Sequence, residues 1–229
     1  AMFASAGYSS TTWSIGDLSS WDVSKVTNMS GMFGSTGHSS TTWTIGDLSK
    51  WNIQKVTNMR YMFSGAGYKS TEFTIEGLSN WDVSKVTNIN FMFDSAGYSS
   101  KTFNLNLSNW NTSSVTNLSY MFKDAGQHST TFNLNLSNWN TSSVTNMSYM
   151  FNATGYRATT FNLNLSNWNT SNVTNMYGVF FSAGYNATTW SVTIPKTTGS
   201  LTNTTSKWYG SSDSVYVPSP AGRSFTLAS

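Results

Sequence analysis

The segment Leu78-Ser-Asn-Trp81-Asp-Val-Ser-Lys-Val-Thr-Asn88-Ile-Asn-Phe-Met92-Phe93 decides the fold, because closely similar segments recur along most of the chain. A unit of this length cannot bury its own apolar side chains, whereas stacked copies share one continuous core. The sequence therefore predicts a solenoid of 29-to-30-residue coils. The recurring tryptophans mark the coils and are Trp21, Trp51, Trp81, Trp110, Trp139 and Trp168.

One short strand is predicted in each coil. In the fourth copy Phe103, Leu105 and Leu107 alternate with asparagines, and a period of two is typical of a strand with one buried face. The first three copies carry one more residue here, as in Trp13-Ser-Ile-Gly-Asp-Leu18. We expect a local bulge to absorb the extra residue.

One short helix is also predicted in each coil. The apolar residues of the second full copy recur at the spacing of one helix face, with Thr57 placed to cap the start and Gly67 to end the helix. The fold class expected from the strand and the helix together is an α/β repeat solenoid. The residues that carry the helical spacing are Val56, Met59, Met62, Phe63 and Ala66.

Three repeated positions are predicted to form ladders down the core. Met-Phe pairs recur once per copy, and the tryptophans lie among apolar neighbours, so both are interpreted as core. The third position is interpreted as a buried amide that hydrogen-bonds the backbone of the adjoining coil. It is occupied by Asn28, Asn58, Asn88, Asn117, Asn146 and Asn175.

Composition limits the possible partners. Charged residues make up only 9%, and the net charge of +3 comes from scattered residues rather than a basic run, so we expect no nucleic-acid partner. No apolar stretch approaches the roughly 18 residues of a membrane span, so no membrane insertion is expected. The chain has no cysteine and therefore no disulfide. Because it begins inside a repeat, we interpret it as a fragment whose signal and anchor lie outside it.

Two regions are expected. Residues 1–190 form the repeat solenoid, with a truncated first copy, and residues 191–229 form a β-rich C-terminal cap that closes the last apolar face. The cap region holds all three prolines and two strand-like stretches, 215–217 and 224–227.

No catalytic residue, cofactor or metal site is predicted. His38 and His128 do not occupy equivalent positions, and Asp22 and Asp82 give way to asparagine in later copies. A carboxylate site should not fade along an array, so we expect a non-enzymatic protein.

A line of aromatic residues along one turn edge is the first candidate binding site. Aromatic rings beside hydroxyl groups suit sugar rings or peptide surfaces, although the same residues could pack over the turns and bind nothing. The line comprises Tyr8, Tyr68, Tyr98, Tyr156 and Tyr185, with His38 and Gln127 in register.

Two further rows allow other interpretations. Outward asparagines of the strands could form a second ladder, or could bond to one another between coils. Threonine pairs, at 11/12, 41/42, 130/131, 159/160 and 188/189, could order water on an ice-binding face, although Glu72 and Lys101 interrupt them. The asparagines are Asn104, Asn106, Asn133, Asn135, Asn162 and Asn164.

The repeat quoted at the start resembles that of the BspA-like bacterial surface proteins, a leucine-rich-repeat-type family, over residues 1 to about 190. The resemblance implies a right-handed leucine-rich-repeat-like solenoid, an extracellular or cell-surface location, and adhesion to host proteins or glycans. We expect the protein to be a monomer. It supplies no catalytic residue. The insertion 96–102 and its equivalents depart from the family's pattern by lengthening each coil. A structural spacer without a ligand is the alternative function.

Overall fold

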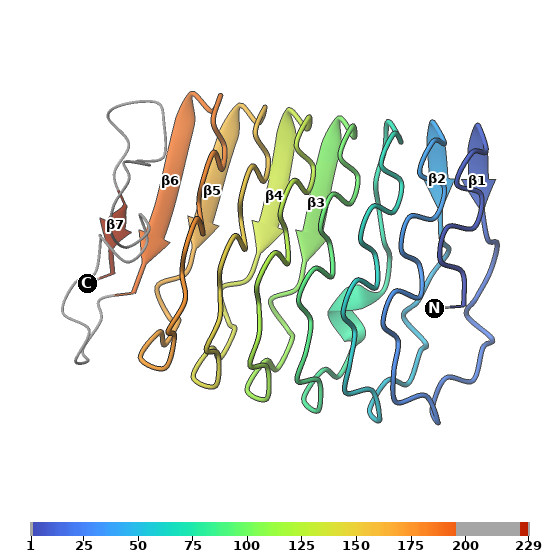
Figure 1. Cartoon of the computed structure of the whole chain (residues 1–229), viewed down its shortest axis with the longest axis horizontal. Helices are drawn as coiled ribbons and strands as arrows, with labels where there is room; N and C mark the ends of the chain where they lie inside the picture. The colour runs from blue at the N-terminus through green and yellow to red at the C-terminus, as the bar shows by residue number, and fades with distance from the viewer. Residues whose placement is uncertain (1, 196–224, 229) are drawn as a thin grey trace.

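The computed structural model describes residues 2–195 and 225–228. The chain winds into a parallel β-solenoid of about six turns, whose coils stand side by side in one row (Figure 1). This arrangement confirms the stacking of successive repeats.

The strands pair in parallel, and equivalent positions of the repeat lie side by side, as at Thr102 and Thr131. Strands β1 (Thr12–Ser14) and β2 (Thr42–Thr44) form one small sheet. A second sheet holds five strands in chain order. The third coil joins the two sheets through isolated bridges, such as Phe73 to Phe103. The strands of the second sheet are β3 (Thr102–Asn106), β4 (Thr131–Asn135), β5 (Thr160–Asn164), β6 (Thr189–Ile194) and β7 (Thr226–Leu227).

The prediction of a helix in each coil is wrong. Throughout the described ranges the only helical element is a single 3-10 turn, η1 (Leu78–Asn80). The segment expected to be helical is a run of turns, in which Met62 donates its N–H to the carbonyl of Met59 at 3.1 Å. Tyr61 and Gly67 have φ values of 57° and 55°, in the left-handed region that an α-helix cannot accommodate.

Hydrogen bonds in this segment alternate between local and inter-coil partners. The N–H of Phe63 donates to Met92 of the next coil at 2.9 Å, whereas the N–H of Ala66 donates back to Phe63 at 3.1 Å. About half of the backbone N–H groups in this segment thus donate to carbonyls of a neighbouring coil, as they would in a β-sheet. Met62, Phe63 and Ala66 nevertheless all face the core, and this is why their spacing looked helical.

The extra residue of the first three coils lies in a turn. Gly16, Gly46 and Gly77 stand just past the strand segment, with φ values of 77°, 74° and 85°. A left-handed glycine therefore takes the place of the expected bulge within the strand.

Stacked aromatic side chains form the core, but Trp21, which was predicted to belong to it, is 38% exposed and stacks on no other tryptophan of the described residues. Neighbouring phenylalanines of the Met-Phe pairs lie 5.1 to 5.8 Å apart between ring centroids, from Phe33 to Phe180. Trp51 to Trp168 stack in the same way, at 6.0 to 6.5 Å. Each of these indoles also donates to a leucine carbonyl of the preceding coil, as Trp110 does to Leu78 at 2.8 Å.

The repeated asparagines hold the coils together differently from the prediction. Their backbones form the parallel bridges between coils, from Asn28–Asn58 to Asn146–Asn175. Their side-chain Oδ1 atoms instead accept the N–H two residues ahead in the same coil, as Asn117 does from Ser119 at 2.9 Å. The amides are half-buried or exposed, because a turn of this kind lies at the surface.

The last coil is covered by residues from the end of the chain. Strand β7 pairs with β6, and the Phe225 ring lies 5.3 Å from the rings of both Phe180 and Trp190. The strand-like stretch 215–217 lies outside the described residues. The cap at 191–229 therefore stays a prediction.

Candidate functional site

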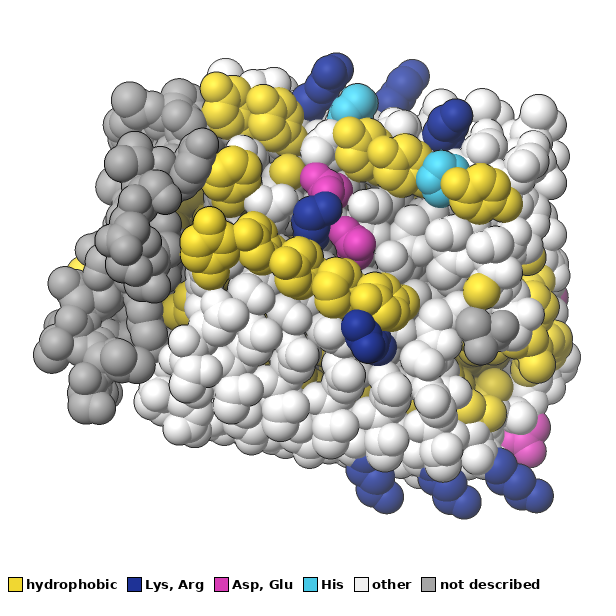
Figure 2. All heavy atoms as spheres, in the orientation of Figure 1, with side chains coloured by type: hydrophobic (Ala, Val, Ile, Leu, Met, Phe, Trp, Pro, Cys, Tyr) yellow, Lys and Arg dark blue, Asp and Glu magenta, His cyan; other side chains and the backbone are white. Residues whose placement is uncertain are grey.

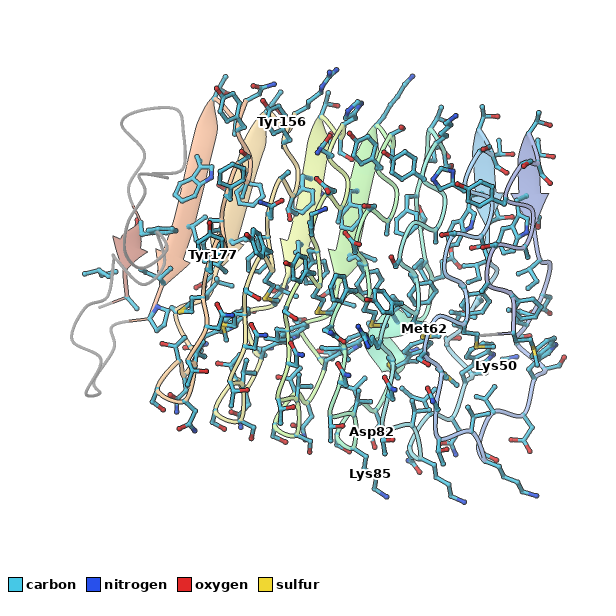
Figure 3. All side chains as sticks on the ribbon, in the orientation of Figure 1. Lys50, Met62, Asp82, Lys85, Tyr156 and Tyr177 are labelled. Carbon is cyan, nitrogen blue, oxygen red and sulfur yellow. The ribbon has the colours of Figure 1, made fainter. Side chains whose placement is uncertain are left out.

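The molecule presents two long faces, one built from the turns and one from the strands. Two lines of hydrophobic side chains run along the turn face, parallel to the stacking axis, with a small charged cluster between them (Figure 2). Tyr156 belongs to one line and Tyr177 to the other (Figure 3).

The structure brings the predicted tyrosines together in two groups. In the first group Tyr8, His38, Tyr68 and Tyr98 stack at centroid distances of 4.4 to 4.6 Å, and in the second Tyr156 stacks on Tyr185 at 4.8 Å. We call these two groups together the tyrosine row. Gln127 interrupts the row between the groups. His128, one residue after Gln127, lies against Tyr98 at 4.8 Å.

Stacking decides how this row can contact a ligand. The planes of Tyr68 and Tyr98 differ by only 9°, so each ring covers the face of the next. The ring faces that a sugar ring would need are therefore occupied within the stack, which leaves the ring edges for contact. Burial, with the neighbouring Tyr98, raises the pKa of the Tyr68 hydroxyl.

A second aromatic row was not predicted from the sequence. Its rings lie 4.5 to 5.2 Å apart, and Arg60 lies 4.5 Å over the first of them. The missed signal is an aromatic residue directly before the Met-Phe pair in four successive copies. We call this set the second row: Tyr61, Phe91, Tyr120, Tyr149 and Tyr177.

Four members of the second row hold an unfavourable backbone conformation. Tyr61, Phe91, Tyr120 and Tyr149 have φ values of 55° to 59°, which cost a bulky side chain about 1–2 kcal/mol each. Glycines 31 and 178 occupy the equivalent position in the flanking coils. Glycine adopts this backbone conformation without strain, so the turn itself does not require an aromatic residue at this position.

The charged cluster lies between the two rows (Figure 2). Lys123 contacts Asp124 at 2.5 Å and Asp94 at 4.0 Å, and Gln127 donates to Asp124 at 2.8 Å. Burial raises the pKa of Asp94 to about 6, against the opposing effect of Lys123. These are the only ion pairs in the part of the chain that the structure describes.

Replacing Asp94 with asparagine is expected to stabilise the protein at pH 7 by about 2–3 kcal/mol, the equivalent of the pKa difference. The raised pKa means that the folded state keeps a proton that the unfolded state loses, so stability falls as the pH rises from about 4 to 6. Thermal unfolding of both proteins between pH 4 and 8 measures the effect. The two should converge near pH 4, and a constant difference at every pH would contradict the assignment.

The described residues give no support for a metal site or a membrane-spanning helix. They include no group of three or more potential metal-ligating side chains, and no helix in them is long and apolar enough to cross a membrane. Burial lowers the pKa of His38 and of His128, so both favour the neutral form.

The strand face carries uncharged rows. Asn106, Asn135 and Asn164 accept the N–H of a serine two residues ahead, as at Ser137, where the distance is 3.2 Å. The expected bonds between asparagine amides of successive coils are not formed among the described strands. The amides of the central row, Asn104, Asn133 and Asn162, make no hydrogen bond within the described part of the chain.

Comparison with known proteins identifies the repeat. No curated protein and no solved structure matches the chain. The family model described as "Mycoplasma protein of unknown function, DUF285" matches residues 2–71 and 66–192, which include strands β1 to β5 and the start of β6. The chain therefore belongs to the DUF285 family of repeat proteins.

Proposed function

We propose that this is a non-enzymatic surface protein that mediates adhesion by binding a host extracellular protein through its turn face. The observation that supports the proposal most strongly is the pair of aromatic rows, which run in parallel along the molecule on one face. The resemblance of the repeat to BspA-like surface proteins supports the cell-surface location.

The chemistry of this face favours a protein partner over a stacked glycan. Tyrosine and arginine are the side chains that most often dominate protein interfaces. Tyr177 is 54% exposed and Tyr8 is 46% exposed, so the rows end in accessible rings. Between the ends, the rows offer ring edges and hydroxyls, which suit backbone and side-chain groups of a protein surface.

The positive φ values of the second row allow its rings to be removed by substitution with glycine, which tests the proposed binding. Tyr120→Gly and Tyr149→Gly remove two rings while leaving a residue that the flanking coils already use at this position. We expect the double variant to lose at least about tenfold in affinity, since buried tyrosines at interfaces commonly contribute more than 1 kcal/mol each.

The measurement is binding to arrayed extracellular-matrix proteins, followed by the affinity for any protein bound. Thr160→Ala, on the strand face, is the control and should bind as the wild type does. Tyr68→Ala with Tyr98→Ala tests the tyrosine row in the same assay. Unchanged binding after loss of both rows would refute the proposal, and no binding by the wild type would favour the spacer role.

One observation supports an ice-binding function as a second candidate. Six threonines point outward from the strand face in parallel register, but Glu72 interrupts their row. Thermal hysteresis of the wild type, compared with a Thr131→Lys variant, tests this function. The threonines are Thr12, Thr42, Thr102, Thr131, Thr160 and Thr189.

A further inference from the structure

A groove of about 480 Å³ lies on the strand face, along β4 and between its neighbours β3 and β5. This volume falls within the roughly 300–1,000 Å³ of small-molecule sites. Asn133, Asn135, Asn162 and Thr131 contribute polar groups to its walls, and Phe132 and Leu134 form part of its lining.

The groove lies where the sheet is locally open. Strands β3 and β4 pair over five residues, whereas β4 and β5 pair only at Thr131 and Thr160. The opening slightly raises the exposure of two core side chains: Phe132 is 5% and Leu134 8% exposed, against 0% and 3% for Phe161 and Leu163 in the next coil. The lining therefore combines an apolar floor with a polar rim.

The opening cannot admit another strand between the coils. Coils five and six remain joined elsewhere, by the bridge between Asn146 and Asn175 and by a hydrogen bond from Thr159 to Thr130 at 3.1 Å. An inserted strand would need the coils to separate by roughly a further 4.8 Å. A ligand must therefore lie along the groove rather than pair into the sheet.

The lining selects for the chemistry of the ligand. It is formally uncharged, since asparagine, threonine, phenylalanine and leucine account for all of it, so nothing in it compensates a charged ligand. The amides of Asn133 and Asn162 are free to donate and accept. Asn135 accepts from the N–H and hydroxyl of Ser137 with its oxygen, which leaves its NH₂ group available.

We propose that this groove binds a short neutral oligosaccharide. A sugar ring presents hydroxyls at its edge and C–H groups on its face, which match the amide rim and the apolar floor. The groove lies on the strand face, whereas the two aromatic rows lie on the turn face. The proposal therefore does not depend on the proposed adhesion to a protein.

The repeat offers a matched control for the test. Asn135 and Asn164 occupy the same place in successive coils, and both accept the N–H of the serine two residues ahead, but of the two only Asn135 lines the groove. Asn135→Ala and Asn164→Ala should therefore both remove the same backbone bond of the turn, and Asn135→Ala also removes the bond from the Ser137 hydroxyl at the surface. Only Asn135→Ala should weaken the binding.

Calorimetric titration with neutral trisaccharides of glucose, galactose, mannose and N-acetylglucosamine, each tested up to millimolar concentration, provides the measurement. We expect at least one to bind the wild type, Asn135→Ala to weaken that binding about fivefold or more, and Asn133→Ala with Asn162→Ala to remove it. Asn164→Ala and Tyr120→Gly should leave it unchanged, which separates this site from the turn face. Equal weakening by Asn135→Ala and Asn164→Ala, or no binding of any trisaccharide by the wild type, would overturn the proposal.

Discussion

Replacing Trp110 with alanine is expected to lower the free energy of unfolding by about 3–5 kcal/mol. Its indole is 1% exposed, stacks between Trp81 and Trp139, and donates to the carbonyl of Leu78 at 2.8 Å. The change leaves a cavity in the middle of the core and a buried carbonyl without its partner, and both costs add. Urea denaturation followed by circular dichroism measures the loss.

The exposed tryptophan of the first coil provides the control for this prediction. Trp21 occupies the same repeat position in the first coil, but it is 38% exposed and makes its aromatic contact with Phe3. Trp21→Ala should therefore cost only about 1–2 kcal/mol, in line with its partial burial. Equal losses from the two changes would show that the tryptophans do not act as a buried ladder.

Gly126→Ala is expected to destabilise the protein by about 2–5 kcal/mol, through two separate effects. The residue has a φ of 51°, and an added Cβ would lie 2.6 Å from Cβ of Phe103 and 2.8 Å from its Cγ. The left-handed conformation costs alanine about 1–2 kcal/mol, and overpacking against the ring adds about 1–3 kcal/mol. Thermal unfolding of the variant and the wild type measures the sum.

Gly16→Ala separates these two effects. Gly16 has a φ of 77°, but nothing lies within 4 Å of the position of an added Cβ, so only the conformational cost applies. We expect a loss of about 1–2 kcal/mol there. A loss at Gly126 no larger than that at Gly16 would mean that the coils do not pack as closely as described.

The repeat and its buried positions could be predicted because stacking copies is the only way for short units to share a core. The strands at Phe103 and Phe132, the phenylalanine ladder and the tryptophan ladder all follow from that requirement. Spacing alone could not distinguish a helix from the run of turns around Met62. Both conformations bury Met62, Phe63 and Ala66, and the difference lies in the left-handed residues between them.

The candidate sites were predictable to a lesser degree. The line of Tyr68 and Tyr98 follows from repeat register, but the face-to-face stacking that covers their rings does not. The second row was hidden by the predicted helix, on which Tyr120 and Tyr149 would be ordinary surface residues. The groove beside Asn133 lies between nearly identical copies, so the sequence of the strands gives no sign of the local opening.

Engineered cysteine pairs test the coaxial stacking of the coils most directly, since the chain has no cysteine of its own. Asn104 and Asn133 are paired outward-facing residues of β3 and β4, and neighbouring strands lie roughly 4.8 Å apart, within reach of a disulfide. Asn104→Cys with Asn133→Cys should oxidise to an intramolecular disulfide, whereas Asn104→Cys with Asn162→Cys, two coils apart, should not. Failure of the first pair to form a disulfide, or equal oxidation of both pairs, would contradict the β-solenoid.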